Sequence, residues 1–306
     1  MALLEDGLRR KQELVEQALA GLVSDGDVPP TLLVALRRSL FPGGKHLRPV
    51  CVLATAELLG HPPEDFLGLA CAVELVHSAS LILDDLPSMD NAARRRGRPA
   101  LHVEFGEATA ILAAIALLAR GFELLADAGR ALRLPRETEA ALVSELAQAV
   151  GARGMAAGQH LDLTAKLTQP QGPGRPDRPG SEELAAIESI HNRKTGRLFV
   201  AAFRLAALAL GADELSLEAL TGFGRNLGLA FQVTDDILSV TATSDQLGKS
   251  SAREERQVNF ATLFGVEAAR TLSRELVQTA QECLALFGPR GDFLRALAQF
   301  VLDRRR

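Results

Sequence analysis

Apolar residues recur three or four positions apart along almost the whole 306-residue chain, which is the spacing of one face of an α-helix. Alanine and leucine dominate these positions, and both residues favour helices. Tyrosine and tryptophan are absent, so the chain lacks much of the aromatic content that is typical of sheets. Clusters of proline and glycine interrupt the pattern at 27–30, 41–44, 60–63 and 288–291. The pattern predicts an all-α protein of roughly ten or more helices.

The longest segment without a helical pattern is the proline- and glycine-rich stretch 168–183. Helical spacing continues on both sides of it, so we expect an exposed loop rather than a linker between domains. Ser181, followed by two glutamates, is typical of a helix start, because a hydroxyl caps the first turn and acids favour its positive end. Residues 1–306 are therefore predicted to form a single helical domain.

Composition narrows the classes of function. The chain has 47% hydrophobic residues and a formal net charge of −4, which argues against wholesale binding of nucleic acid. Cys51, Cys71 and Cys283 lie in apolar runs without metal-ligand spacing, which is typical of reduced core thiols. The N-terminus lacks the apolar core of a signal peptide, and apolar runs such as 198–211 are too short or too charged to span a bilayer. We expect a cytoplasmic protein without a membrane span.

An acidic motif ends one of the apolar runs. In LILDDLPSMDN, Asp84, Asp85 and Asp90 follow a sequence typical of a buried helix, where carboxylates are rare unless something binds them. On a continuous helix Asp84 and Asp90 would point about 120° apart, so the carboxylates converge only if the helix ends or distorts between them. Pro87 predicts such an end. Convergent carboxylates suit a hard cation such as Mg²⁺, which also binds substrate phosphates.

A second acidic pair, Asp235 and Asp236, follows another apolar run in GLAFQVTDDILSV. Two acidic helix ends that face each other across a cleft could hold several Mg²⁺ ions and clamp a diphosphate. Either pair alone would also be explained by an exposed helix cap or a solvated turn. The presence of two such pairs, each after an apolar segment, favours a metal site.

Basic motifs accompany the acids. In FPGGKHLRP, two glycines precede Lys45 and Arg48, and glycine lets a backbone approach an anion closely. Further cations are Arg94, Arg95, Arg96 and Arg98 in RRRGRP, Lys194 beside Thr195 in IHNRKTGRLF, and Lys249 in DQLGKS. A single run of charge is usually a solvated surface. Next to carboxylates suited to Mg²⁺, however, these cations favour phosphate recognition.

Taken in this order, the motifs resemble those of one family. GGKHLRP, HSASLILDDLPSMDN with RRGRP, GQHLDL, HNRKTG and GLAFQVTDDIL with LGK are similar to the motifs of the trans-isoprenyl diphosphate synthases, which include the farnesyl and geranylgeranyl diphosphate synthases. The resemblance covers nearly the whole chain, including the C-terminal LAQFVLDRRR, which resembles the basic tail of the family. It implies an all-α, isoprenoid-synthase-like bundle around a central cleft, a homodimer, and Mg²⁺ as the cofactor.

The resemblance also implies roles for individual residues. Asp84, Asp90 and Asp235 would bind Mg²⁺, with Asp85 and Asp236 in support. Arg95, Lys194 and Lys249 would bind the allylic diphosphate, and Lys45, Arg48, His77 and Arg96 the diphosphate of isopentenyl diphosphate. Thr195 and Gln232 would line the reaction centre, and Gln159 and Asp162 match a further polar stretch.

The implied activity is Mg²⁺-dependent condensation of isopentenyl diphosphate with an allylic prenyl diphosphate to a longer trans-prenyl diphosphate. Ala79, five residues before Asp84, is small where a bulky residue often closes the cleft. We therefore expect a long product, of about fifteen to twenty carbons or more, unless another side chain closes the cavity.

Some positions depart from the family pattern. Ser239 stands where a third aspartate is usual, Ala92 and Ala93 where acids are common, and His46 where arginine is usual. Two alternatives stay open. One is a terpene-synthase-like cyclase of a prenyl diphosphate, although the cations implied for the isopentenyl subsite argue against it. The other is a weakly active or regulatory subunit of a prenyl synthase, which the lost acids favour.

Overall fold

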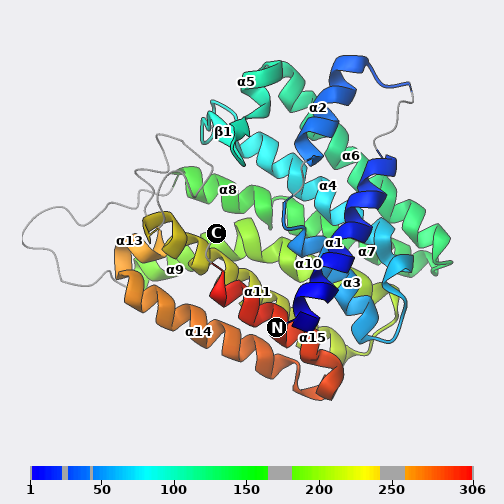
Figure 1. Cartoon of the computed structure of the whole chain (residues 1–306), viewed down its shortest axis with the longest axis vertical. Helices are drawn as coiled ribbons and strands as arrows, with labels where there is room; N and C mark the ends of the chain where they lie inside the picture. The colour runs from blue at the N-terminus through cyan, green and yellow to red at the C-terminus, as the bar shows by residue number, and fades with distance from the viewer. Residues whose placement is uncertain (1, 23–26, 42–43, 165–180, 242–258, 305–306) are drawn as a thin grey trace, which may run out of the picture. The chain divides into compact units, whose positions relative to one another are not determined.

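The computed structural model describes residues 2–22, 27–41, 44–164, 181–241 and 259–304, and they are almost entirely helical (Figure 1). In chain order the elements are α1 (Ala2–Leu22), α2 (Pro30–Leu40), α3 (Leu47–Leu58), η1 (Pro63–Phe66), α4 (Leu67–Asp84), β1 (Arg94–Arg95), β2 (Arg98–Pro99), α5 (Leu101–Phe105), α6 (Glu107–Ala131), α7 (Arg136–Val150), α8 (Met155–Thr164), α9 (Ser181–His191), η2 (Asn192–Gly196), α10 (Arg197–Ala209), α11 (Glu214–Thr241), α13 (Phe260–Phe264), α14 (Val266–Cys283), η4 (Ala285–Gly291) and α15 (Asp292–Asp303). The prediction of an all-α fold with ten or more helices is confirmed.

The chain forms two compact units. The described residues of the first come from Met1–Leu146 and Ala202–Asp213, and those of the second from Ala147–Ala201, Glu214–Leu247 and Arg256–Arg306. The single domain expected over 1–306 stays a prediction. Most of the expected loop 168–183 lies outside the described residues, but α9 begins at Ser181, where the cap pattern places a helix start.

Helix α4 is the core of the first unit and packs along α6 (Figure 1). Glycines let the two helices approach closely. A Cβ on Gly121 of α6 would stand 2.9 Å from Cγ2 of Val76, and a Cβ on Gly68 of α4 would stand 2.9 Å from Cβ of Ala128. Helix α3 packs on α4 as well, and Cys51 and Cys71 are buried there as predicted. This rigid packing fixes the C-terminal end of α4, where the first acidic motif lies.

In the second unit, the long helix α11 packs along α14, and the two run side by side in Figure 1. The π-helical turn η2 joins α9 to α10 and contacts both α8 and α11. Two glycines make room for it. A Cβ on Gly158 of α8 would stand 2.7 Å from Cα of Lys194, and a Cβ on Gly228 of α11 would stand 3.0 Å from Cα of Gly196. This tight packing places Lys194 and Thr195 beside α8 and α11.

Two segments, Pro63–Asp84 and Glu107–Ala131, are long and apolar enough to cross a membrane by length and composition. In the first, 67% of the apolar window is buried within the protein, as in the core helix of a globular fold. In the second segment only 39% of the apolar window is buried, so this helix exposes apolar side chains. The argument that the apolar runs are too short does not hold for these two helices, so the expected lack of a span stays a prediction.

Candidate functional site

The first acidic motif lies where α4 ends, as Pro87 predicts. Helix α4 stops at Asp84, and Asp85 is its C-cap. The chain then folds back, because the backbone N–H of Asp90 donates to the carbonyl of Asp84 at 2.9 Å. The N–H of Ala92 likewise donates to the carbonyl of Asp85 at 3.2 Å. The turn therefore brings the backbones of the three aspartates together at one helix end.

Carboxylates are electrostatically unfavourable at this position, because the C-terminal end of a helix already carries partial negative charge. Part of that charge is neutralised by Arg95 from β1. Its Nε and Nη2 donate to Oδ2 and Oδ1 of Asp85, both at 2.6 Å, and Asp85 is only 3% exposed. Burial lowers the pKa of Arg95, but the hydrogen bonds and charge of Asp85 outweigh it and raise the pKa overall. Asp84 and Asp90 are half-buried.

A cluster of cations lies in the same unit. Arg48 of α3 contacts His77 of α4, with 3.1 Å between Nη1 and Nε2. A guanidinium can only donate, so Nε2 of His77 accepts and the ring is neutral with its hydrogen on Nδ1. Burial, with Arg48 and Arg96 nearby, lowers the pKa of His77 well below its usual value. The ring is therefore a fixed acceptor that orients Arg48.

Arg96 lies in the turn between β1 and β2 and adopts a left-handed backbone, with φ of 51°. This conformation costs a residue other than glycine or asparagine about 1–2 kcal/mol. Its guanidinium covers Gly44, where a Cβ would stand 2.7 Å from Cζ. The glycine of GGKH thus admits the Arg96 side chain. Burial lowers the pKa of Arg96, and Glu74 opposes that effect. A strained arginine held in a basic cluster is a candidate anion-binding group.

Arg48 lies in the same short segment as Lys45, three residues further along the chain. The side-chain amide of Gln12 on α1 donates to the carbonyl of Lys45 at 2.6 Å and fixes the backbone there. A cavity of about 60 Å³ adjoins the cluster, and its lining includes Arg38, Arg95, Arg96, Arg98 and Asp85. The first unit therefore brings the residues predicted for the isopentenyl subsite close to those predicted for metal binding.

The second acidic pair is placed differently from the expectation of a helix end. Helix α11 continues to Thr241, so Asp235 and Asp236 lie within the helix. Asp236 is tolerated there because its carboxylate is satisfied by hydrogen bonds. Oδ1 accepts from Nε2 of Gln232 at 3.1 Å, and Oδ2 accepts from the backbone N–H of Phe260 at 3.0 Å. The expected helix end at this pair is therefore wrong.

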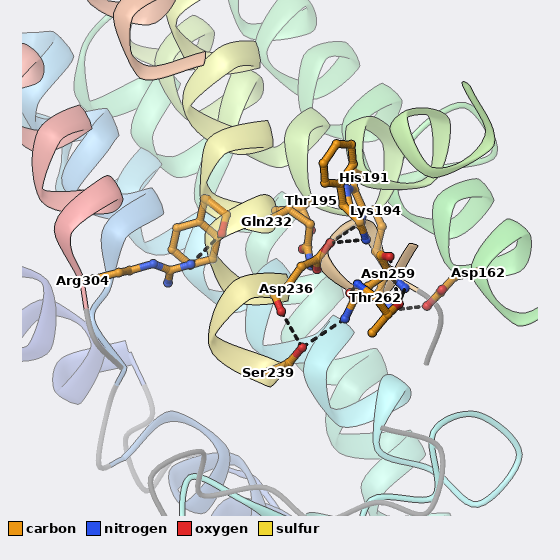
Figure 2. A network of polar contacts seen from close by, with 12 residues as sticks. Asp162, His191, Lys194, Thr195, Gln232, Asp236, Ser239, Asn259, Thr262 and Arg304 are labelled. Carbon is orange, nitrogen blue, oxygen red and sulfur yellow. Dashed lines mark hydrogen bonds and ion pairs between the residues drawn. The ribbon is translucent and has the colours of Figure 1, made fainter. Parts of the chain in front are cut away.

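Asp236 belongs to a buried polar network (Figure 2). The hydroxyl of Thr195 donates to Oε1 of Gln232 at 2.9 Å, and Nε2 of His191 lies 3.5 Å from Oδ2 of Asp236. Burial raises the pKa of Asp236 to about 7, although the hydrogen bonds from Gln232 and Phe260 oppose it. Burial also lowers the pKa of His191 to about 4. Both oxygens of Asp236 are used within the protein, so the residue suits a supporting role.

Asp235 already holds a cation. Arg304, just after α15, donates from Nη2 to Oδ1 of Asp235 at 2.7 Å and to the carbonyl of Phe231 at 2.6 Å. Its guanidinium lies 3.8 Å from the centre of the Phe231 ring. The Asp235 side chain is 43% exposed, whereas that of Arg304 is 5% exposed. The resemblance includes the basic tail but assigns no role to Arg304. The only signal for this residue in the sequence is the run of three arginines to which it belongs.

Lys194 and Ser239 also have defined partners (Figure 2). Nζ of Lys194 lies 2.7 Å from Oδ2 of Asp162 on α8. The hydroxyl of Ser239 donates to the carbonyl of Asp236 at 2.7 Å and accepts from Nδ2 of Asn259 at 3.0 Å. Asn259 caps α13, so Ser239 ties α11 to α13. Lys249 lies outside the described residues.

The donor set fits Mg²⁺ in its chemistry. The predicted ligands Asp84, Asp90 and Asp235 offer carboxylate oxygens. Asp235 binds the guanidinium of Arg304 in place of a metal ion. Among the described residues, no group of three or more His, Cys, Asp and Glu side chains is arranged to hold a metal. Mg²⁺ commonly takes only one or two carboxylates and completes its shell with waters and substrate phosphates. In the first unit, Asp84 and Asp90 at the end of α4 would hold it, and in the second unit Asp235 on α11 is the predicted ligand.

Curated proteins similar to this chain are prenyl transferases. The chain is 37% identical over 303 residues to a dimethylallyltranstransferase of Fischerella ambigua (strain UTEX 1903), which covers 98% of this chain and 84% of that protein. It is 36% identical over 299 residues to a geranylgeranyl diphosphate synthase of Cyanophora paradoxa, covering 97% and 95% of the two chains.

Solved structures similar to this chain are enzymes of the same class. An FPP/GFPP synthase of Zymomonas mobilis superposes with a TM-score of 0.84 at 30% identity, over 99% of this chain and 100% of that one. A geranyltransferase of Helicobacter pylori, complexed with magnesium and isoprenyl diphosphate, gives a TM-score of 0.79 at 29% identity, over 97% and 96%. The profile of the family described as polyprenyl synthetase matches residues 29–285. With its fold, its motifs and most of its length in agreement, the chain belongs to the polyprenyl synthetase family.

Proposed function

We propose that the protein is a Mg²⁺-dependent trans-prenyltransferase that joins isopentenyl diphosphate to an allylic prenyl diphosphate. The observation that carries the proposal is the cluster of cations at the end of α4. Arg48 is oriented by a neutral His77, and Arg96 is held over Gly44 by a strained turn. An enzyme that only ionised a single prenyl diphosphate would not need this second anion site.

Charge neutralisation is the main catalytic requirement. Mg²⁺, when bound, supplies positive charge to the departing diphosphate. The bond between the allylic carbon and the diphosphate oxygen breaks, and its electron pair leaves with the diphosphate. The π electrons of isopentenyl diphosphate form the new carbon–carbon bond, and one proton leaves the isopentenyl unit for the released diphosphate. No side chain has to act as a general base.

The chain's own residues bind and orient the reactants. Lys194 and Lys249 bind the allylic diphosphate, and Arg95 does so beside the metal ligands. Lys194 is preorganised for this by Asp162, and the turn η2 fixes its backbone. Lys45, Arg48 and Arg96 bind the isopentenyl diphosphate. Thr195 and Gln232 present their dipoles to the developing allylic cation, while apolar walls exclude water that would capture it.

The site-bearing helix α4 also sets product length. Ala79 is 2% exposed and lies on α4, five positions before Asp84. A methyl group there would leave room for a longer hydrocarbon tail than a bulky side chain would, so we propose that the product has about twenty carbons or more.

The protein acts as a cytoplasmic homodimer in this proposal. Helix α6 exposes Ile111, Leu112 and Ile115, at 38%, 57% and 57%. Ile115 lies four residues after Ile111 and three after Leu112, so the three side chains lie on one apolar face of the helix. A second copy of the chain is the occupant that the proposal assigns to this face, since exposed apolar stripes of this kind are typical of interfaces.

One assay tests the function. The purified protein is incubated with Mg²⁺, isopentenyl diphosphate and dimethylallyl, geranyl or farnesyl diphosphate, and the products are identified by mass spectrometry. Elongated diphosphates support the proposal. A cyclic hydrocarbon made without consumption of isopentenyl diphosphate would instead indicate a cyclase. No turnover until an active synthase is added would indicate a regulatory subunit.

A further inference from the structure

His46 has an unusual position in the segment that carries Lys45 and Arg48. It is the N-cap of α3 and adopts a left-handed backbone, with φ of 45° and ψ of 37°. That conformation is uncommon for a residue other than glycine, although asparagine, aspartate and histidine adopt it more often than the rest. The side chain is almost fully buried, with 1% exposed, whereas N-cap side chains usually face solvent and bond the first turn. The residue is therefore held in place by something other than helix capping.

The partner of His46 is a buried acid on α4. Nδ1 of His46 lies 2.9 Å from Oε1 of Glu74, and the Glu74 side chain is 4% exposed. Because a carboxylate can only accept a hydrogen bond, Nδ1 carries the hydrogen. On the other side of the ring, Nε2 lies 3.5 Å from Oε1 of Glu16 on α1. The imidazole thus joins the loop before α3 to α4, while its Nε2 has no hydrogen-bond partner among the described residues.

Glu74 is close to the cations of the proposed isopentenyl subsite. It lies one helical turn before His77, which accepts from Arg48. Its charge also acts on Arg96, whose guanidinium covers Gly44. A buried carboxylate at this point fixes the loop and partly balances the cations before an anion arrives.

We propose that His46 and Glu74 are positioning residues for the isopentenyl diphosphate subsite. Their hydrogen bond holds the left-handed backbone at His46, and this backbone fixes the directions in which Lys45 and Arg48 leave the loop. The inference rests on the proposed function, because it assigns that subsite its anion. It adds residues that touch no substrate and act through Lys45, Arg48 and Arg96.

Three variants separate the effect of the left-handed backbone at His46 from the effect of its hydrogen bond with Glu74. His46→Asn keeps a side-chain donor and tolerates the left-handed backbone. His46→Gly keeps the backbone freedom and removes the donor. Glu74→Leu keeps a similar side-chain volume and removes the acceptor. Glu57→Gln is the matched control, because Glu57 pairs with Lys11 between α3 and α1, away from the loop.

The measurements are KM for each substrate, kcat, and binding of isopentenyl diphosphate alone by calorimetry, with thermal unfolding to check the fold. We expect His46→Gly and Glu74→Leu, which each remove the hydrogen bond, to raise KM and Kd for isopentenyl diphosphate about tenfold, the loss typical of one charge-assisted hydrogen bond. KM for the allylic substrate and kcat should stay within about twofold, and His46→Asn should remain near the parent protein. Glu57→Gln should change neither KM nor Kd for isopentenyl diphosphate.

The inference is overturned if His46→Gly matches His46→Asn, or if both substrates lose affinity equally. It is also overturned if the parent binds no isopentenyl diphosphate. Failure of the proposed function alone would give a different result from failure of this inference. The parent would then bind isopentenyl diphosphate without elongating any allylic diphosphate, and the weaker binding of the two variants would still support the inference.

Discussion

Nη2 of Arg304 donates to Oδ1 of Asp235 at 2.7 Å, so a cation from the C-terminal end of the chain occupies the carboxylate that is expected to bind Mg²⁺. The guanidinium also stacks on Phe231 and donates to its carbonyl. Three contacts hold Arg304, whereas the half-exposed Asp235 has water as an alternative partner. A divalent cation at Asp235 must therefore compete with Arg304.

Arg304→Gln should strengthen binding of a divalent cation. The change removes the competing charge, and an ion pair with a partly exposed partner is worth at most about 1 kcal/mol, which corresponds to about fivefold in affinity. Titration with Mn²⁺, followed by electron paramagnetic resonance, measures the effect directly. Arg270→Gln is the control, because Arg270 forms an exposed pair with Glu267. Unchanged or weaker Mn²⁺ binding in Arg304→Gln would show that the contact does not compete with metal.

Asp84→Ala should mainly lower activity, whereas Ser239→Ala should mainly lower stability. Loss of Asp84 removes a proposed metal ligand and should lower kcat about a hundredfold or more. Ser239 links Asp236 to Asn259, so its loss should lower the free energy of unfolding by about 1–2 kcal/mol and leave kcat within a few-fold. Steady-state kinetics and urea unfolding test the pair. Equal losses of activity would show that Ser239 takes part in metal binding.

The burial of Asp236 and His191 predicts a specific dependence of stability on pH. The pKa of Asp236 is raised from 3.8 to about 7, so the folded state binds a proton more readily than the unfolded state, and this contribution to stability falls as pH rises through that range. The pKa of His191 is lowered from 6.5 to about 4, so its contribution rises with pH between those values. In the parent the two effects oppose each other between about pH 4 and 6.5.

Asp236→Asn removes one of the two opposing groups. Its Tm, measured in a chelator, should rise more steeply with pH between 4 and 6.5 than the Tm of the parent, because only the His191 contribution remains. His191→Gln is the complementary variant, and its Tm should fall with pH over this range. Parallel curves for all three proteins would contradict the assignment of these groups.

Ala79→Phe should shorten the product. Ala79 is buried on α4, and a phenyl ring there would occupy the proposed hydrocarbon channel. Product analysis by chromatography with the same primer is the measurement. An unchanged Tm within a few degrees shows that the ring is accommodated rather than overpacked. Unchanged product length in a folded variant would place the floor of the channel elsewhere.

Leu112→Glu should dissociate the proposed dimer. The substitution puts a charge on the apolar stripe of α6, where its desolvation would oppose association. Light scattering coupled to size-exclusion chromatography gives the mass. Leu215→Glu is the control, because Leu215 is 70% exposed at the start of α11. A parent protein that runs as a monomer, or a variant that stays dimeric, would reject this face.

Local sequence signals predict much of the fold and the helix end that carries the first acidic motif. The end of α4 follows from Pro87 and three acids, and the start of α9 follows from the cap at Ser181. Both features depend on residues within a few positions of each other. The helical character of the chain likewise follows from the spacing of alanine and leucine.

Features that depend on distant partners could not be predicted. Asp236 is tolerated inside α11 because the backbone N–H of Phe260, twenty-four residues away, satisfies it. The same local pattern therefore suggested a helix end that does not exist. Arg304 meets Asp235 across 69 residues, and His46 meets Glu74 across 28. Such pairs arise only from tertiary packing, about which hydrophobic spacing carries no information.

The most direct test of the central claim is the stoichiometry of diphosphate release. The protein is given Mg²⁺ and geranyl diphosphate, with and without isopentenyl diphosphate, and released diphosphate and products are both quantified. The account predicts that release depends on isopentenyl diphosphate, with one diphosphate freed for each isopentenyl unit added to the chain. Release without isopentenyl diphosphate, accompanied by a hydrocarbon product, would contradict it.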